Sequence, residues 1–186
     1  MTAPERAEPP AEPPAEPPRV VVMGPSGAGK SVVGEALATH LAERFPGIDF
    51  VDSDDLHPAA NVKKMRAGIA LEDADRWPWL ARVGEALAAA EGTGRVIACS
   101  ALRRAYRDAI RAACPDATFV ELVVPADELG DRVSDRPGHF MPATLLASQL
   151  GALEPLQDDE RGIRIENTGP LDEVVTRVIA ALSADW

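Results

Sequence analysis

One eight-residue segment near the N-terminus has the residue types and the spacing to hold a chain of phosphates. Residues 24–31 read Gly-Pro-Ser-Gly-Ala-Gly-Lys-Ser, which fits the P-loop pattern of glycine, four residues, glycine, lysine and serine or threonine. The glycines let the backbone turn tightly, so that successive N–H groups point at an anion. We expect Lys30 to reach the β- and γ-phosphates and the Ser31 hydroxyl to bind Mg²⁺. The segment therefore predicts binding of ATP with magnesium.

Two carboxylates, Asp52 and Asp54, follow the next expected strand. In open parallel sheets, ligands bind at the carboxyl ends of the strands. One carboxylate there could hold the water shell of Mg²⁺ while the other orients an acceptor hydroxyl and takes its proton. Aspartates also form plain acidic loops and helix caps. For the two aspartates alone, the catalytic and the structural interpretation are equally plausible. The nearby P-loop favours the catalytic one.

Several arginines follow expected strand ends and could bind an anionic acceptor: Arg76, Arg103, Arg104 and Arg107. A guanidinium can grip a carboxylate through two parallel hydrogen bonds. Arginine is, however, the usual cation of this chain, because lysine occurs only at positions 30, 63 and 64. A solvated surface position is therefore the alternative for each. His57 precedes a proline in a polar loop, which favours a polar contact over a core position.

The expected elements alternate between strand and helix. Short apolar runs predict strands over 20–23, 49–52, 95–99, 118–124 and 162–166, and apolar spacing predicts helices over 31–44, 61–67, 78–90, 102–113, 126–134, 142–153 and 171–182. This order implies an α/β fold with a parallel sheet covered on both faces. Residues from about 132 to 142 interrupt this alternation of strands and helices, because they lie between two helices. A kinase would carry a lid at this place.

Composition narrows the function further. The 186 residues carry a net charge of −11, which argues against nucleic-acid binding, since that needs a basic face. Two cysteines make no disulfide framework or zinc signature, and no apolar stretch is long enough for a membrane span. We expect a cytoplasmic protein. Residues 1–18 repeat Ala-Glu-Pro-Pro and predict a disordered tail, which leaves residues 19–186 as one domain.

Taken together, the motifs resemble the gluconokinase family of P-loop kinases, whose fold is like that of shikimate kinase and nucleoside monophosphate kinases. The resemblance covers nearly all of residues 20–182. It lies in segments 23–31, 52–58, 61–65, 68–71, 73–80, 99–108, 138–140, 148–150 and 153–155. Segment 99–108 and the His-Pro pair at 57–58 separate gluconokinases from shikimate kinases.

The resemblance implies ATP-dependent phosphorylation of D-gluconate to 6-phospho-D-gluconate by direct in-line transfer, which feeds the pentose phosphate and Entner–Doudoroff routes. It also implies a three-layer P-loop fold with a five-stranded parallel sheet in the order 2-3-1-4-5, helices on both faces, a lid and, frequently, a homodimer. No nucleic acid or membrane partner is expected.

The family pattern also implies roles for individual residues. Asp54 would orient and deprotonate the 6-hydroxyl of gluconate, Asp52 and Ser31 would hold Mg²⁺, and Lys30 and Arg136 would assist transfer. Residues expected to line the gluconate site are Asp54, His57, Arg76, Ser100, Arg103, Arg107 and His139. Residues expected to hold the nucleotide are Gly24, Pro25, Ser26, Gly27, Ala28, Gly29, Lys30, Ser31, Val32, Arg132, Arg136 and Thr168.

Two other functions share part of this pattern. A kinase of another small hydroxy acid, such as shikimate, would share the P-loop but would not need segment 99–108. A regulatory module that binds ATP without an acceptor would need neither the acidic pair nor the acceptor-side motifs.

Overall fold

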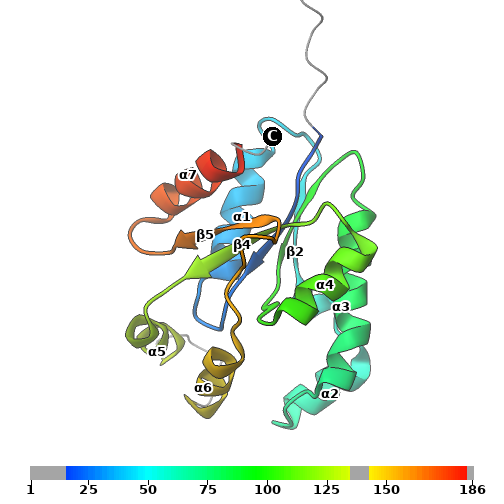
Figure 1. The fold of residues 1–186 in the computed structure, drawn as a ribbon, viewed down its shortest axis with the longest axis vertical. Coiled ribbons are helices and arrows are strands. Elements are labelled where there is room, and N and C mark those ends of the chain that lie inside the picture. Colours follow the sequence, from blue (N-terminus) through cyan, green and yellow to red (C-terminus); the bar gives the residue numbers. More distant parts are fainter. Residues whose placement is uncertain (1–15, 135–142, 184–186) are drawn as a thin grey trace, which may run out of the picture.

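The sheet has five parallel strands in the order β2-β3-β1-β4-β5 (Figure 1). The computed structural model describes residues 16–134 and 143–183, so most of the predicted tail and the centre of the predicted lid lie outside the described residues. The strands are β1 (Arg19–Met23), β2 (Asp49–Asp52), β3 (Arg95–Ala98), β4 (Thr118–Val123) and β5 (Gly162–Glu166). The expected fold class and strand order are confirmed.

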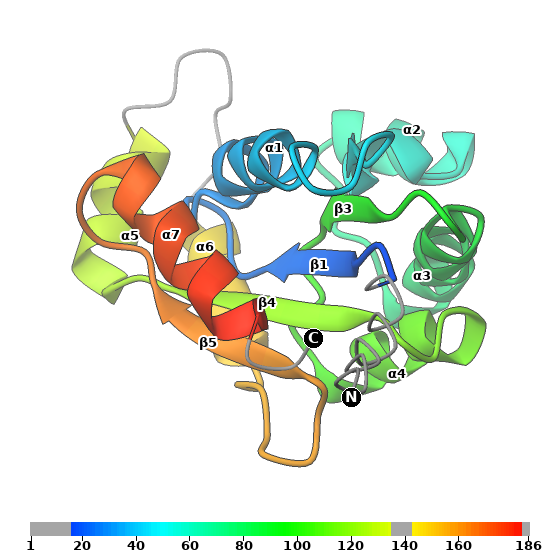
Figure 2. The ribbon, with the colours of Figure 1, turned by 90° about the horizontal axis from the view of Figure 1, so that it is seen from above.

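Helices cover both faces of this sheet. The helices are α1 (Lys30–Leu41), α2 (Ala59–Arg66), α3 (Asp73–Ala88), α4 (Arg104–Ala113), α5 (Ala126–Ser134), α6 (Ala143–Ala152) and α7 (Leu171–Leu182), with a 3-10 helix η1 (Ser53–Leu56) after β2. Figure 1 shows α1 and α7 on one side of the sheet and α3 and α4 on the other, and in Figure 2 β1 lies between α1 and α4. The molecule therefore has three layers.

Alternation along β1 explains these layers. Val20 and Val22 are fully buried in a core formed with α1 and α7, whereas Val21 and Met23 are fully buried in a second core formed with α3 and α4. A strand covered on both faces must be apolar at every position, because successive side chains point to opposite faces. The continuous apolar run in β1 follows from this requirement.

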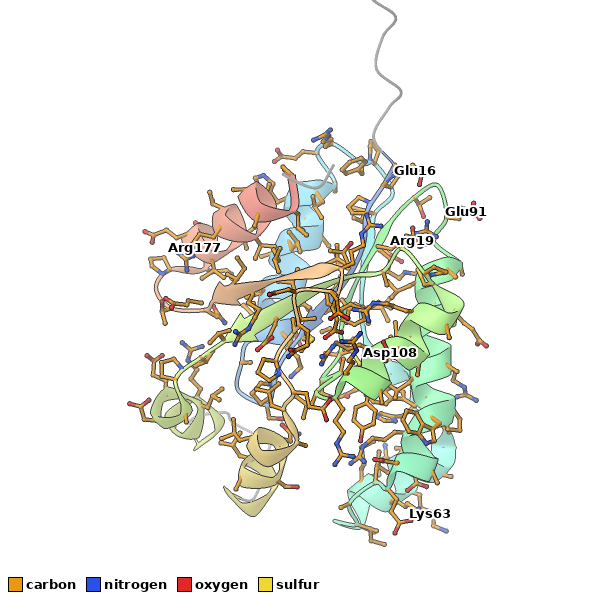
Figure 3. All side chains as sticks on the ribbon, viewed as in Figure 1. Glu16, Arg19, Lys63, Glu91, Asp108 and Arg177 are labelled. Carbon is orange, nitrogen blue, oxygen red and sulfur yellow. The ribbon has the colours of Figure 1, made fainter. Side chains whose placement is uncertain are left out.

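The central strands begin together and end together. Arg19 of β1 and Asp49 of β2 are both in register with Arg95 of β3, so the segments that follow these strands emerge at the same edge. Figure 3 shows Arg19 at one end of the molecule and Lys63, on α2, at the other. The phosphate loop, η1 and the segment after β3 therefore meet at the carboxyl edge of the sheet.

Helix α3 differs from its expected start. We placed its beginning at Pro78, but it begins at Asp73 and contains that proline. The start is fixed by a cap, because the Asp75 carboxylate accepts the Glu72 backbone N–H at 2.9 Å and both oxygens accept from Lys64 Nζ at 2.7 Å. Among the described residues, no helix combines the length and apolar character needed to cross a membrane.

Candidate active site

The phosphate loop has the backbone that its sequence predicts. Gly24, Gly27 and Gly29 have φ angles of 146°, 82° and 85°, which side-chain-bearing residues rarely adopt. A Cβ on Gly29 would also lie 2.7 Å from Nδ2 of Asn167, whose amide donates to the carbonyl oxygen of Ala28 at 2.6 Å. Gly29 immediately precedes α1, so the loop ends at a helix N-terminus, where the dipole favours an anion. The loop is built to hold phosphate.

Lys30 and Ser31 face the interior of this arrangement. Lys30 Nζ donates to the carbonyl oxygen of Pro25 at 3.1 Å, so that the ammonium lies over the loop. Ser31 Oγ donates to Asp52 Oδ2 at 2.8 Å. Val32, also expected near the nucleotide, has a largely exposed side chain, which leaves its backbone N–H as the group that could contribute.

Ser31 and Asp52 fit a magnesium site. Mg²⁺ in phosphotransferases is held by one or two protein oxygens together with substrate phosphates and waters, rather than by a cage of side chains. A hydroxyl and a carboxylate oxygen 2.8 Å apart beside a phosphate loop supply such a pair. The described residues contain no cluster of three or more His, Cys, Asp or Glu side chains that could hold a metal alone.

Asp54 lies in η1, the turn that Asp52 caps. Its backbone N–H donates to Asp52 Oδ1 at 3.1 Å, which fixes the turn that carries it. Partial burial of the carboxyl and then the negative charge of Asp52 raise the pKa of Asp54, while the charges of His57 and Lys30 oppose that rise. The Asp54 carboxyl therefore lies within range of the charges of both Lys30 and His57.

His57 is held by a buried polar network. Its ring stacks on Trp79 with centroids 4.2 Å apart, and its Nδ1 lies 3.3 Å from the Asn61 amide nitrogen. Asn61 also donates to the Asp75 carbonyl oxygen, and the Trp79 indole donates to the Ser53 carbonyl oxygen at 2.7 Å. Because an amide nitrogen can only donate, Nδ1 accepts and the neutral ring carries its proton on Nε2. Burial lowers the pKa of His57, which favours this neutral donor form.

Arg76 and Arg103 meet at one carboxylate. Arg76 Nη1 donates to Asp73 Oδ1 at 2.8 Å and Arg103 Nη1 donates to Asp73 Oδ2 at 3.2 Å. The Tyr106 hydroxyl donates to Asp73 at 2.6 Å, and both guanidinium groups lie 5.7 Å from the Tyr106 ring centre. The Tyr106 hydrogen bond, followed by the two arginines, holds the pKa of Asp73 below its usual value. Two cations against one anion leave a local positive charge that suits a carboxylate ligand.

Arg107 does not join this group, so its expected place in the acceptor site is corrected. Its side chain is 0% exposed and forms a buried ion pair with Glu160 through bonds of 2.6 and 2.7 Å. It also donates to the carbonyl oxygens of Ala101, Leu102 and Glu154. Ala101 has a φ of 40°, which is uncommon outside glycine. From its buried position, Arg107 therefore holds the backbone of the segment after β3 in place.

The remaining expected residues lie around this centre or outside the described residues. The Ser100 carbonyl oxygen accepts from Gly24 N at 3.3 Å, which joins the segment after β3 to the phosphate loop. Arg132 donates to Glu128 and to the Asn167 carbonyl oxygen, both at 3.0 Å, and the Thr168 carbonyl oxygen accepts from Arg177. Arg136 and His139 lie outside the described residues.

Known proteins similar to this chain agree on one family. A family model described as an AAA domain matches residues 20–156. A gluconokinase of Gluconobacter oxydans is 45% identical over 168 residues, which cover 89% of this chain and 92% of that protein. The chain belongs to the gluconokinase family.

Solved structures of kinases share the fold of this family member. A gluconokinase from Sinorhizobium meliloti is 44% identical with a TM-score of 0.80, over 90% of this chain and 93% of that one. A shikimate kinase from Aquifex aeolicus is only 18% identical with a TM-score of 0.56, over 90% of this chain and 97% of that one, and shows the shared fold alone.

Three residues of this gluconokinase-family site carried no role in the sequence: Asn61, Asp73 and Tyr106. All three fall inside the motifs that resemble the family, so their place in the pattern was the available signal. Their roles depend on partners distant in the sequence, such as Asp73 for Tyr106, 33 residues away. Spacing along the chain does not report such contacts.

Proposed function

We propose that this protein transfers the γ-phosphoryl group of ATP to the 6-hydroxyl of D-gluconate, giving 6-phospho-D-gluconate and ADP. The observation that carries the proposal is that one turn joins Asp54 to the phosphate side of the site, because Ser31 Oγ donates to Asp52 Oδ2 and the Asp54 N–H donates to Asp52 Oδ1. The charges of both Lys30 and His57 act on the Asp54 carboxyl. Membership in the gluconokinase family supports the same reaction.

The transfer would proceed in line, without a phospho-enzyme. The Asp54 carboxylate takes the proton of the 6-hydroxyl while the oxygen of that hydroxyl forms a bond to the γ-phosphorus. At the same time, the bond between the γ-phosphorus and the β–γ bridging oxygen breaks, which releases ADP. Lys30 and the loop N–H groups stabilise the charge on the phosphoryl oxygens. Ser31 and Asp52 would hold magnesium, which when bound neutralises charge on the β- and γ-phosphates. Positioning of the two substrates supplies much of the remaining rate.

The shape of gluconate matches the two ends of the acceptor side. Gluconate is a six-carbon chain with a primary hydroxyl at one end and a carboxylate at the other. Asp54 suits the hydroxyl end, and Arg76 with Arg103 suits the carboxylate end, since guanidinium groups bind carboxylates in a fixed geometry. His57, as a neutral Nε2 donor, and Ser100 would contact hydroxyls between them. His139 belongs to the same proposal.

Several finer parts of the proposal rest on the family pattern. Arg132 and Arg136 would bring charge to the phosphates from the lid region, and Thr168 would lie near the base of the nucleotide. A homodimer, a cytoplasmic location and entry of the product into the pentose phosphate and Entner–Doudoroff routes are likewise part of the proposal.

A coupled ADP-release assay tests the acceptor. D-gluconate, other aldonates, shikimate and no acceptor are compared at the same ATP and magnesium concentrations. We expect ADP release to depend on D-gluconate and to be near background without an acceptor. Preference for shikimate would replace gluconate as the acceptor, and slow hydrolysis that no acid changes would indicate a regulatory ATP-binding module.

A further inference from the structure

Gln149 joins α6 to the phosphate loop. It lies in segment 148–150, one of the family motifs to which the sequence assigned no role. Its side-chain oxygen Oε1 accepts the Ser26 backbone N–H at 2.7 Å, across 123 residues of sequence. In Figure 1, α6 lies below the carboxyl edge of the sheet, on the opposite side of that end from α2. A side chain from outside the P-loop motif therefore holds one of the loop's own N–H groups.

Gln149 and Lys30 are hydrogen-bonded to the same peptide group, that between Pro25 and Ser26. The Pro25 carbonyl oxygen belongs to the Pro25–Ser26 peptide group and accepts from Lys30 Nζ at 3.1 Å and from Ala28 N at 3.2 Å. A peptide group is planar, so fixing the direction of its N–H also fixes the direction of its C=O. Gln149 on one edge of this plane thus determines where the oxygen that holds the Lys30 ammonium points.

The C-terminal end of α6 and the segment that follows it are anchored well enough to do this. Glu154 donates its N–H to the Leu102 carbonyl oxygen at 2.8 Å and accepts the Arg104 N–H at 2.7 Å. The next turn of chain is fixed by Leu156, whose N–H donates to the buried carboxylate of Glu121 at 2.8 Å. These bonds attach the segment after α6 to α4 and to β4, so Gln149 reaches the loop from a fixed base.

The chemistry of a glutamine suits this place. A neutral amide oxygen accepts the Ser26 N–H without adding negative charge beside a site for polyphosphate. A glutamate would accept the same hydrogen bond but would repel the nucleotide. The residue type is therefore compatible with both the empty loop and a loop holding phosphate.

We infer that Gln149 is a positioning residue, which orients the Pro25–Ser26 peptide group and through it the Lys30 ammonium. Its effect on phosphoryl transfer rests on the proposed function. Its effect on Lys30 in the nucleotide-free protein does not.

Chemical labelling of Lys30 tests this inference without any substrate. The protein carries three lysines, at positions 30, 63 and 64, so mass spectrometry after brief exposure to an amine-acetylating reagent can resolve each one. The variants are Gln149→Met, which keeps the length of the side chain but loses the amide oxygen, and Gln157→Met. Gln157 is a matched control, because its exposed side chain donates only to the nearby Pro155 carbonyl oxygen among the contacts of the described residues.

In Gln149→Met we expect Lys30 to be labelled about three to ten times faster than in the unaltered protein, the factor that corresponds to losing one neutral hydrogen bond. Labelling of Lys63, on exposed α2, should not change, and Gln157→Met should match the unaltered protein at all three lysines. Equal Lys30 labelling in the two methionine variants would overturn the inference. Faster labelling of all three lysines would report unfolding instead.

A second variant keeps the test decisive if Gln149→Met unfolds. Gln149→Glu retains the acceptor oxygen, so Lys30 should be labelled no faster than in the unaltered protein, and faster labelling would overturn the inference. With Mg-ATP, Gln149→Met should raise the KM for ATP more than the KM for gluconate. If Lys30 labelling behaves as expected but nucleotide has no effect on any variant, the proposed function fails and the positioning role stands.

Discussion

At the scale of single residues, the site depends on carboxylates and cations whose surroundings give them different tasks. Asp52 is hydrogen-bonded to Ser31 and suits a metal ligand, whereas Asp54, two residues further along the same turn, has a raised pKa and suits a base. Arg76 and Arg103 share an accessible carboxylate partner, whereas Arg107 is enclosed. The environment, rather than the residue type, separates these roles.

Replacing Asp54 should remove the base and its pH dependence. For Asp54→Asn we expect kcat to fall by roughly a hundredfold or more, the usual contribution of a general base, with ATP affinity little changed. Because burial raises the pKa of Asp54, the base stays protonated to a higher pH than an ordinary aspartate, and kcat should fall as pH falls through that raised pKa. The variant should lack this acidic limb. Steady-state kinetics over a pH series measure both effects, and an unaltered kcat would exclude Asp54 from the mechanism.

Replacing Arg107 should affect stability far more than replacing its neighbour Arg104. Arg107→Met leaves Glu160 buried without its main partner, and breaking such a pair costs about 3–5 kcal/mol. Arg104→Met removes an ion pair with Asp159 whose side chains are 42% and 66% exposed, and such pairs are worth about 0–1 kcal/mol. Chemical denaturation gives both values. Equal losses would contradict the structural role that we assign to Arg107.

At the scale of elements, the boundaries follow local sequence where local chemistry sets them. The strands at 49–52 and 162–166 and the helix at 171–182 are predicted at their observed limits. The start of α3 is predicted five residues late, because Pro78 suggested a first turn while the cap at Asp75 and its bonds to Lys64 act from further upstream. Local propensity does not predict a cap whose partners, Lys64 and Asp75, lie eleven residues apart.

The phosphate loop offers a direct comparison between two glycines. Gly29→Ala would place a Cβ 2.7 Å from Asn167 Nδ2, whereas Gly92→Ala, at a similar φ of 81°, meets nothing within 4 Å. Both substitutions should cost about 1–2 kcal/mol of backbone strain. Only Gly29→Ala should weaken nucleotide binding, by about tenfold or more, because it also displaces the loop. Titration calorimetry with Mg-ADP measures this, and equal affinities for the two variants would contradict the account of the loop.

At the scale of the whole molecule, the strand order was expected and the long-range contacts were not. The sheet order agrees with the family resemblance, and the ends of β1, β2 and β3 meet at one edge, which brings together the motifs that follow those strands. The partners Arg107–Glu160 and Gln149–Ser26 lie 53 and 123 residues apart. Residue type and spacing cannot pair such groups, so an arginine expected in the site proved to be in the core.

The Glu160 pair should also shape the acid stability of the domain. Burial alone would raise the pKa of Glu160, but hydrogen bonds from Arg107, the Gln157 N–H and Arg111 outweigh it and lower the pKa from 4.5 to about 2. A carboxylate with a lowered pKa stabilises the fold above its unfolded pKa and loses that contribution as pH falls towards the folded value.

Comparing Glu160→Gln with the unaltered protein isolates this contribution. From pH 4.5 to pH 2, the difference between their unfolding free energies should shrink by roughly 3 kcal/mol. Asp158→Asn, on the exposed part of the same segment, is the control for removing a carboxylate there. Denaturation curves at several pH values measure the difference. A constant difference between the curves would show that Glu160 has no lowered pKa.

The central claim is that one phosphoryl group moves from ATP to the primary hydroxyl of gluconate. Phosphorus NMR of a mixture of the protein, Mg-ATP and D-gluconate tests it directly. We predict that the γ-phosphate signal is replaced by one phosphomonoester signal split by two protons of a CH₂–O–P group, in equal amount to the ADP formed. Release of inorganic phosphate in place of that ester, or an unchanged spectrum, would contradict the account.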